Sequence, residues 1–380
     1  MMRYLRRWYY YIGLFLIYTI VFIGSVASVL LRAITAVMVQ ETMQSIFLVA
    51  LLTTAFMIGR SISAFLTGFI SDKVRRKNLL AFLGFSLLTL VNFSYLILPV
   101  EFYHFLRFLM GISSGIAWPM MQRLVLDFSP EKRRHRSTSV YFLLGWLGLT
   151  VGYYEFGRIP DEIALILAIL LFVIITLLTL FLKPPESKIV TTKKTKRRKE
   201  RKLIPPISTI VLLSLCFGIS IGVISVDFLV GYLMIKFKTK IDVSNILTMA
   251  SLFGFILSYF LGWSLDKYPK KSTVFASALL IPIGLFGFPF AETKEAMIAD
   301  IAFIRASVSG FRPILIAQAK AEKKTGLRIG IINSVSNIAT SIMLAFIGYV
   351  IELQLTLVIF IAIGMLCFCM IFAALLLWKT

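Results

Sequence analysis

Twelve long apolar runs, separated by short polar segments, dominate this 380-residue sequence. An α-helix needs about 20 mainly apolar residues to cross the hydrocarbon core of a bilayer, and the runs are of that length. The alternation of apolar and polar residues that marks a membrane β-barrel is absent. The sequence therefore predicts an all-α polytopic membrane protein with 12 transmembrane helices. The runs lie near 12–37, 43–70, 79–98, 102–126, 137–157 and 161–182, and then near 206–233, 245–265, 273–291, 295–317, 328–350 and 355–378.

The residue types present give no support for metal, cofactor or catalytic chemistry. The three cysteines, Cys216, Cys367 and Cys369, lie in apolar runs without a Cys-x-x-Cys pair, which is typical of small core residues. His104 and His135 are the only histidines, so a zinc or haem centre is not expected. A Gly-x-x-x-x-Gly-Lys-Ser/Thr loop for ATP and a clustered acid–base set are both missing. We expect no cofactor, no metal and no enzymatic activity.

The formal net charge of +22 reflects the placement of basic residues rather than an affinity for nucleic acid. Thirty of the 40 lysines and arginines lie in segments on the side of the two termini, and five lie on the opposite side. Cytoplasmic loops of membrane proteins carry such an excess of positive charge. We therefore expect both termini to be cytoplasmic, and lipids rather than nucleic acid to surround the chain.

A basic segment separates the first six apolar runs from the last six, and it holds ten lysines and arginines. This arrangement predicts a first six-helix bundle at 1–182, a basic cytoplasmic linker at 183–205 and a second six-helix bundle at 206–380. Charge blocks of this kind are commonly solvated linkers, which is the interpretation we favour. A contact with anionic lipid or a regulatory contact is the alternative.

The two halves share residues at a fixed offset of 194 positions. Four residues at the end of the second run recur at the end of the eighth, and a proline in the fourth run recurs in the tenth. A tandem duplication accounts for this offset, so we expect two six-helix pseudo-repeats that can rock against each other around a site at their interface. The recurring pairs are Gly68 and Gly262, Asp72 and Asp266, Lys73 and Lys267, Lys77 and Lys271, and Pro119 and Pro313.

The two halves, the basic middle loop and two motifs resemble the major facilitator superfamily over essentially the whole chain. The loop motif of that family runs Gly-x-x-x-Asp-Arg/Lys-x-Gly-Arg-Arg/Lys, and here an arginine, Arg75, replaces its second glycine. A second family pattern, Arg-x-x-x-Gly-x-x-x-Gly, is similar to span four. The resemblance implies a structural or coupling role for the arginine of that pattern. The matching residues are Gly68, Asp72, Lys73, Arg76 and Lys77 in the loop and Arg107, Gly111 and Gly115 in span four.

The resemblance also implies a gating role for Asp72 and for Asp266 in the second copy of the loop. A carboxylate at the end of a membrane helix can bind cations or the N-terminus of a neighbouring helix. Contacts that form in one rocking state and break in the other bias their populations. Gly68 and Gly262 would let a helix approach closely. The alternative is a basic loop that only sets topology, with an incidental acid.

Five arginines lie within the predicted spans, whereas Asp227 in span seven is the clearest deep acid. Arg32 in span one lies 195 residues before Asp227, and these spans meet across the pseudo-twofold axis in the resembling family. We expect the two residues to pair. The pair could latch the outer side, carry a coupling proton or form a permanent salt bridge. The five arginines are Arg32, Arg60, Arg107, Arg305 and Arg312.

Three of these arginines are candidates for substrate binding in addition to Arg32. Arg60 corresponds to Gly254 in the second half, so inherited scaffold does not account for it. Arg305 and Arg312 lie seven residues apart on one face of span ten. They could offer planar donors to a carboxylate or phosphate. Pairing with Asp300 or with lipid headgroups is the alternative.

Asn333 and Asn337 form a polar stripe in span eleven, either to bond neighbouring helices or to line the solute path. The excess of buried arginine over buried acid favours an anionic solute. The sequence therefore predicts a monomeric secondary active transporter that moves a small, anionic organic solute by alternating access. Its energy would come from a proton, another ion or a solute gradient. The alternatives are a drug or metabolite exporter and a receptor or scaffold that keeps the fold without transport.

Overall fold

The computed structural model describes residues 2–74, 76–130, 134–182, 207–267, 271–318 and 325–377. Within these ranges the side chains are described except at 2–8, 134–135, 207, 210, 258–259, 261–267, 271–274 and 310–318. The predicted linker at 183–205 therefore lies outside the described residues. The same holds for the side chains predicted to act at Gly262, Asp266, Lys267, Lys271 and Arg312.

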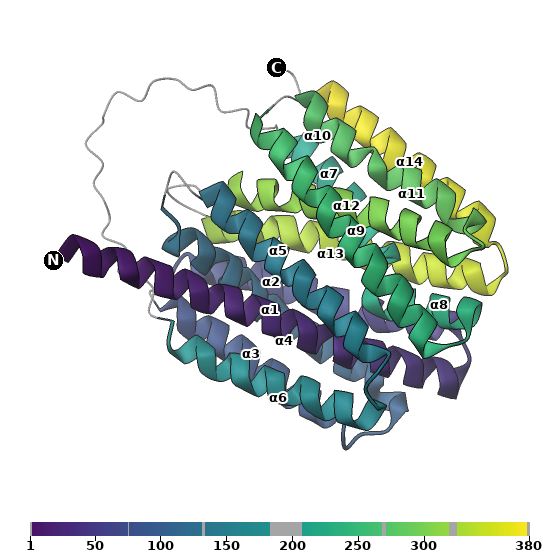
Figure 1. Cartoon of the computed structure of the whole chain (residues 1–380), viewed down its shortest axis with the longest axis horizontal. Coiled ribbons are helices and arrows are strands. Elements are labelled where there is room, and N and C mark those ends of the chain that lie inside the picture. The colour runs from purple at the N-terminus through teal and green to yellow at the C-terminus, as the bar shows by residue number, and fades with distance from the viewer. Residues whose placement is uncertain are drawn as a thin grey trace.

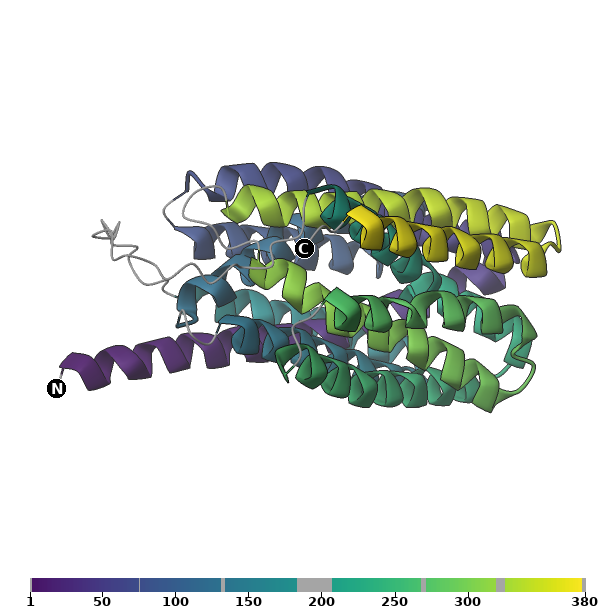
Figure 2. The same cartoon turned by 90° about the horizontal axis from the view of Figure 1, so that it is seen from above.

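The first half of the chain forms six long helices that run back and forth along a common direction (Figure 1). In a bilayer the backbone amides find no water, so each span must satisfy its own hydrogen bonds as a helix. The first helix continues beyond its neighbours at the N-terminal end (Figure 2). The elements are α1 (Met2–Met43), α2 (Ile46–Ser71), α3 (Lys77–Ser94), the 3-10 turn η1 (Val100–Phe102), α4 (Tyr103–Phe128), α5 (Arg134–Phe156) and α6 (Asp161–Leu180).

The second half is helical as well, but two of its predicted spans are interrupted. The run near 206–233 divides into two helices bent by 42° around Ile224 and Ser225. The run near 273–291 divides into three short pieces. The elements are α7 (Ile207–Val223), α8 (Val226–Phe237), α9 (Lys240–Lys267), α10 (Lys271–Ala278), α11 (Leu280–Gly287), the 3-10 turn η3 (Phe288–Phe290), α12 (Lys294–Gln318), α13 (Thr325–Glu352) and α14 (Thr356–Leu377).

Seven helices of the described chain are long and apolar enough to cross a membrane, or eight if the bent pair α7 and α8 forms one span. Many of their large apolar side chains are exposed on the outside of the bundle, including Phe15, Leu90 and Phe181. An exposed apolar surface of this extent requires lipid as its solvent. The protein is therefore an integral, multi-pass membrane protein, as the sequence predicts.

Two pairs of helices make the most extensive contacts between the two halves. Within the first half, α1 packs against α5 and α6, and α4 packs against α2 and α3. Within the second half, α12 packs against α9 and α11, and α7 packs against α13 and α14. Between the halves, α2 lies beside α13 and α5 lies beside α9. Figures 1 and 2 show these helices side by side.

Glycines set the closest helix contacts. A Cβ atom on Gly111 of α4 would lie 2.1 Å from the carbonyl oxygen of Phe56 in α2, and a Cβ on Gly115 would lie 2.6 Å from that of Arg60. A Cβ on Gly68 of α2 would lie 2.6 Å from the carbonyl oxygen of Gly326 in α13. Real side chains do not reach these distances, so glycine is required for the backbones to approach.

Candidate functional site

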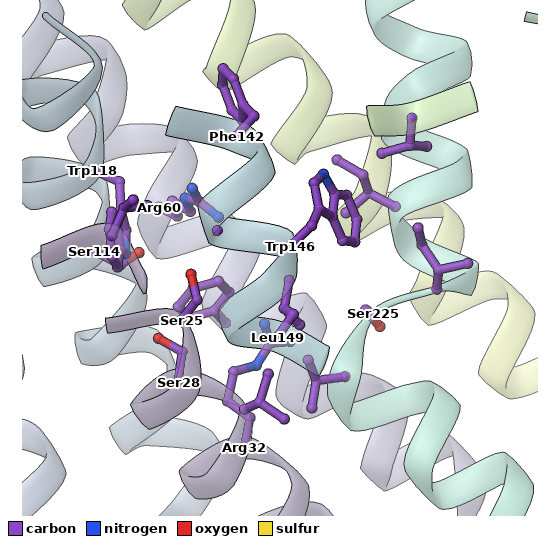
Figure 3. Close-up of a pocket in the computed structure, with 18 of the residues that line it drawn as sticks. Ser25, Ser28, Arg32, Arg60, Ser114, Trp118, Phe142, Trp146, Leu149 and Ser225 are labelled. Atoms are coloured by element: carbon purple, nitrogen blue, oxygen red, sulfur yellow. The ribbon is translucent and has the colours of Figure 1, made fainter. Parts of the chain in front are cut away.

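A cavity of about 230 Å³ lies between the two halves. The first half contributes residues of α1, α2, α3, α4 and α5, and the second half contributes residues of α7, α8 and α12. Figure 3 shows Trp118, Phe142 and Trp146 around this space, together with Ser25 and Ser28 of α1. A pocket between helices of two packed bundles is a usual place for a small-molecule site.

Among the side chains that the structure describes, three guanidinium groups line the cavity and no acidic group does. The structure brings together Arg32 of α1, Arg60 of α2 and Arg305 of α12, all of them candidates from the sequence. Arg32 and Arg60 lie against the same ring of Phe56, with their Cζ atoms 4.8 and 5.7 Å from its centroid. The cavity wall is therefore strongly positive.

Arg305 is almost completely buried, with 1% of its surface exposed. Its Nη1 donates to the carbonyl oxygen of Leu247 at 3.0 Å and to the hydroxyl of Ser251. Its Nη2 donates to the hydroxyl of Tyr153 at 3.1 Å, and its Cζ lies 5.0 Å from the centroid of that ring. These partners are neutral, so they hold the guanidinium in place without balancing its charge.

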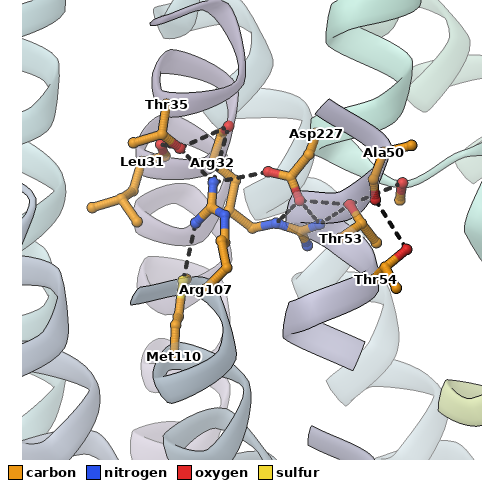
Figure 4. Close-up of polar contacts among 10 residues, drawn as sticks. Leu31, Arg32, Thr35, Ala50, Thr53, Thr54, Arg107, Met110 and Asp227 are labelled. Atoms are coloured by element: carbon orange, nitrogen blue, oxygen red, sulfur yellow. Dashed lines mark hydrogen bonds and ion pairs between the residues drawn. The ribbon is translucent and has the colours of Figure 1, made fainter. Parts of the chain in front are cut away.

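Asp227, at the start of α8, holds two arginines at once (Figure 4). Its Oδ2 accepts from Nε and Nη2 of Arg32 at 3.1 and 2.5 Å and from the hydroxyl of Thr53 at 2.6 Å. Its Oδ1 accepts from Nη2 of Arg107 at 2.8 Å. The side chains of Asp227 and Arg107 are fully buried, and that of Arg32 is 11% exposed. The expected partners Arg32 and Asp227 thus form a cluster with Arg107.

The cluster connects α1, α2 and α4 of the first half to α8 of the second half. Arg107 also donates from Nη2 to the Thr35 hydroxyl and to the carbonyl oxygen of Arg32 at 3.3 Å. A buried ion cluster is a poor source of net stability, but removing one partner leaves an uncompensated charge. The arrangement can therefore act as a specific contact between the halves. Which of the three roles considered for Arg32 and Asp227 it performs stays a prediction.

On the side of the chain termini, Asp72 binds the N-terminus of α13. Its Oδ1 accepts from the backbone N–H of Gly326 at 2.9 Å, and its Oδ2 accepts from that of Leu327 at 3.1 Å. Arg123 of α4 donates to Oδ1 at 3.3 Å. A carboxylate at a helix N-terminus satisfies free backbone donors and interacts favourably with the helix dipole. This contact joins the halves and can be broken when they separate.

We expect the Asp72→Ala variant to transport several-fold more slowly while it still folds and inserts. The contact is partly exposed and is worth about 0.3–1 kcal/mol, so its loss shifts the balance of conformations rather than unfolding the chain. Flux per molecule in reconstituted vesicles measures the effect. Glu162→Ala, which removes an exposed carboxylate at the other end of the bundle, is the control. Full transport by Asp72→Ala would exclude gating by this residue.

Other residues predicted from the sequence lie outside the cavity wall. Asn333 donates to the side-chain oxygen of Gln122, which does line the cavity, at 3.0 Å. Asn337 is buried in α13, with 3% of its surface exposed. In the loop motif, Lys77 pairs with Asp127 at 2.6 Å. The other motif cations also lie outside the cavity lining: Lys73 lies over the ring of Phe69, and Arg76 precedes the first residue of α3.

Several residues of the site were not predicted from the sequence. Thr53 completes the carboxylate cluster, Tyr153 and Ser251 hold Arg305, and Trp118 and Trp146 wall the cavity. Each lies in an apolar run, where hydroxyls and aromatic rings are common in ordinary helix packing. Among the described residues, no group of three or more His, Cys, Asp or Glu side chains could hold a metal ion.

Fold and site together define a polytopic α-helical membrane protein with a basic cavity between the two halves of the chain. The sequence matches the Major Facilitator Superfamily over residues 12–311 and 210–380. The chain therefore belongs to this superfamily of membrane transporters, which confirms the resemblance noted in its motifs.

Three solved structures have a similar fold. The human organic anion transporter MFSD10 (TETRAN) has a TM-score of 0.73 and 14% identity, over 96% of this chain and 98% of that one. The transporter FucP in the outward conformation has a TM-score of 0.67 and 16% identity, over 98% and 100%. A POT family transporter in complex with 5-aminolevulinic acid has a TM-score of 0.72 and 14% identity, over 96% and 95%. No curated protein sequence is significantly similar to this chain.

Proposed function

We propose that this protein is a secondary active transporter that moves a small organic anion across the membrane by alternating access. The central observation is Arg305, a buried guanidinium in the cavity wall whose hydrogen-bond partners are all neutral. A charged side chain at membrane depth costs several kcal/mol unless a partner or water compensates it. An anionic group of a solute supplies that compensation when it binds.

The charge of the whole cavity supports the same proposal. Arg32 and Arg60 line it together with Arg305, and the described part of its lining includes no aspartate or glutamate. Guanidinium groups bind carboxylates and phosphates through paired, charge-assisted hydrogen bonds. The name of MFSD10, one of the structures with a similar fold, specifies organic anions, which agrees with this assignment.

The proposed architecture has 12 spans in two six-helix pseudo-repeats. Helices α4, α5 and α12 are 26, 23 and 25 residues long, enough to cross a bilayer despite their polar residues. With α7 and α8 as one bent span and α10 and α11 as another, the total is twelve. The repeats would be 1–182 and 206–380, joined by the linker at 183–205. The excess of basic residues on the terminal side supports cytoplasmic termini.

The proposed mechanism is a rocking of the two bundles around the cavity. The Asp227 cluster and the Asp72 contact join the halves at different depths, so they can open separately. Sequential opening of contacts on either side is what alternating access requires. An ion or solute gradient would drive the cycle, and the protein would work as a monomer.

Reconstituted vesicles containing the full chain test the proposal. We expect flux of small carboxylates or phosphate monoesters under an imposed pH or solute gradient. Matched neutral amides and amines should not move. Lys294→Gln, which removes an exposed cation outside the cavity, should leave the flux unchanged. Flux of amines or amides without flux of any anion would contradict the proposal and favour an exporter of drugs or metabolites.

A further inference from the structure

We propose that the cavity binds a solute with two anionic groups, one held by Arg32 in the first half and the other by Arg305 in the second half. This inference rests on the proposed function and specifies the charge of the solute. It follows from the balance of charges in two separate parts of the cavity wall.

The first part is the cluster around Asp227, where two guanidiniums share one carboxylate. Both carboxylate oxygens are occupied, by Arg32 and Thr53 on one side and by Arg107 on the other. One positive charge therefore remains. Arg107 is fully buried and does not line the cavity, whereas Arg32 is partly exposed and does. The remaining charge is accessible to a solute at Arg32.

The second part is Arg305, which carries a full positive charge among neutral partners. Its Nε is buried and makes no hydrogen bond to any described residue. Arg32 lies on α1 and Arg305 on α12, so the two uncompensated charges belong to different halves of the protein. A solute with one anionic group compensates one of them and leaves the other buried.

The space between the two arginines suits a compact, apolar body. A volume of about 230 Å³ holds roughly eight water molecules at about 30 Å³ each. From the second half, Ile221, Ile224 and Val308 line the cavity. Carboxylates or phosphates at the two ends of a short hydrocarbon chain would place charge at the arginines and hydrocarbon against these side chains.

Binding of matched probes to the purified full-length protein tests the charge of the solute. Tryptophan fluorescence can follow binding because Trp118 and Trp146 wall the cavity. The probes are succinate and its longer homologues, their monoamides and diamides, and phosphate monoesters with and without a carboxylate. We expect the best dianion to bind at least about ten-fold more tightly than its monoamide. In Arg305→Gln this ratio should fall to about one, and in Lys294→Gln it should not change.

The outcomes separate this inference from the proposed function. Equal affinity for dianions and monoamides would overturn the dianion assignment and leave the transport of anions intact. A preserved ratio in Arg305→Gln would also overturn it. Binding of diamides or amines, with no binding of any anion, would contradict the proposed function itself. Preference for phosphate esters over dicarboxylates would identify phosphate as one of the two groups.

A second inference comes from the opposite end of the helix pair α2 and α13, which run antiparallel. Asp72 follows α2 and binds the start of α13. Glu352, the last residue of α13, binds the start of α2. Its Oε2 accepts from the Ser45 hydroxyl at 2.9 Å and from the Phe47 backbone N–H at 3.0 Å. A Cβ on Gly348 would lie 2.5 Å from that of Ala50, so the helices are in close contact here as well.

The helices α5 and α9, which also join the halves, are held together by hydrogen bonds at the same end. Arg158, just after α5, donates to the side-chain oxygen of Asn245 at 3.1 Å and to the Ser244 hydroxyl at 3.4 Å, both near the start of α9. Positions 158 and 352 are separated by 194, the offset that relates the two halves of the sequence. We infer that Glu352 and Arg158 together latch the cavity shut on the side opposite the termini.

Labelling of a cysteine in the cavity tests this latch. The reporter is Ser28→Cys in a Cys369→Ser background, because Ser28 lines the cavity and Cys369 is the exposed cysteine among the three. We expect Glu352→Ala to speed labelling by an impermeant maleimide from the outside by about two- to five-fold. Glu295→Ala, which removes an exposed glutamate at that end, should not.

Two further variants distinguish the loss of the latch from a general loosening of α13. Glu352→Gln retains an acceptor oxygen and should label at an intermediate rate, whereas a general loosening of α13 would not depend on that oxygen. Combining Glu352→Ala with Arg158→Ala should increase the rate beyond either single change. An unchanged labelling rate in this double variant would overturn the latch.

Discussion

The Asp227→Asn variant should lose about 3–5 kcal/mol of stability, one of the two largest effects we expect from any single substitution in this protein. Asparagine keeps the size of the side chain and an acceptor oxygen but removes the charge. Arg107 is fully buried beside it and has no other acidic partner among the described contacts. Thermal unfolding of the purified protein in detergent measures the loss.

A double variant tests the cause of this loss. Replacing Arg107 by methionine in the Asp227→Asn background removes the uncompensated guanidinium and fills a similar volume. Because well-packed apolar residues can replace a buried ion pair at little cost, we expect most of the stability to return. Unchanged unfolding of the Asp227→Asn single variant would show that the cluster does not bury its charge as described.

The same double variant separates the roles considered for Arg32 and Asp227. A permanent salt bridge predicts that transport returns together with stability, because the cluster then serves only as scaffold. A latch or a coupling site predicts stable protein that transports poorly, because the contact between α1 and α8 must form and break during the cycle. Flux and unfolding measured on one preparation distinguish these outcomes.

The sequence predicts much of the ion cluster because deep charges are scarce in membrane helices. Asp227 is the clearest deep acid, and Arg32 lies at nearly the corresponding depth in span one. Their pairing follows from the cost of leaving either charge unpaired and from the meeting of spans one and seven in the resembling family. The membership of Arg107 does not follow in this way, because its motif implies a structural or coupling role without naming a partner. Only the packing of α4 against α1 brings its guanidinium to the carboxylate.

The break in span seven was not predictable from the local sequence. Span seven reads as one apolar run, and neither residue at the bend, Ile224 or Ser225, is a glycine or proline. The break places the Ser225 hydroxyl 3.4 Å from that of Thr53 and starts α8 just before Asp227. The bend therefore coincides with contacts to the first half, and neither residue at the bend is a helix breaker.

The polar stripe of span eleven shows where a periodic pattern is ambiguous. A four-residue spacing places Asn333 and Asn337 on one helix face, but the spacing does not say what that face meets. In the structure Asn333 reaches the Gln122 side chain across the interface between the halves, and neither asparagine lines the cavity. The contact of Asn333 agrees with hydrogen bonding between helices, the more common reason for such a stripe, whereas the Asn337 amide nitrogen has no hydrogen-bond partner among the described residues.

The second large effect is expected for Gly111→Ala, a change of one methyl group between α4 and α2. That methyl would lie 2.1 Å from the Phe56 carbonyl oxygen and 3.0 Å from the Arg60 backbone nitrogen. Both are backbone atoms, so α2 must move as a unit to make room. Overpacking of this kind typically costs about 1–3 kcal/mol and sometimes more.

The displacement of α2 should reach the cavity because Phe56 and Arg60 also line it. Gly222→Ala is the matched control: its added methyl would meet nothing closer than 3.6 Å, the distance to the Thr340 carbonyl oxygen. We expect Gly111→Ala to lower both the unfolding temperature and the anion affinity, and Gly222→Ala to change neither by much. Equal unfolding temperatures for the two variants would show that Gly111 does not set the spacing of α2 and α4. Lower stability with unchanged affinity would mean that the cavity arginines hold their positions independently of that spacing.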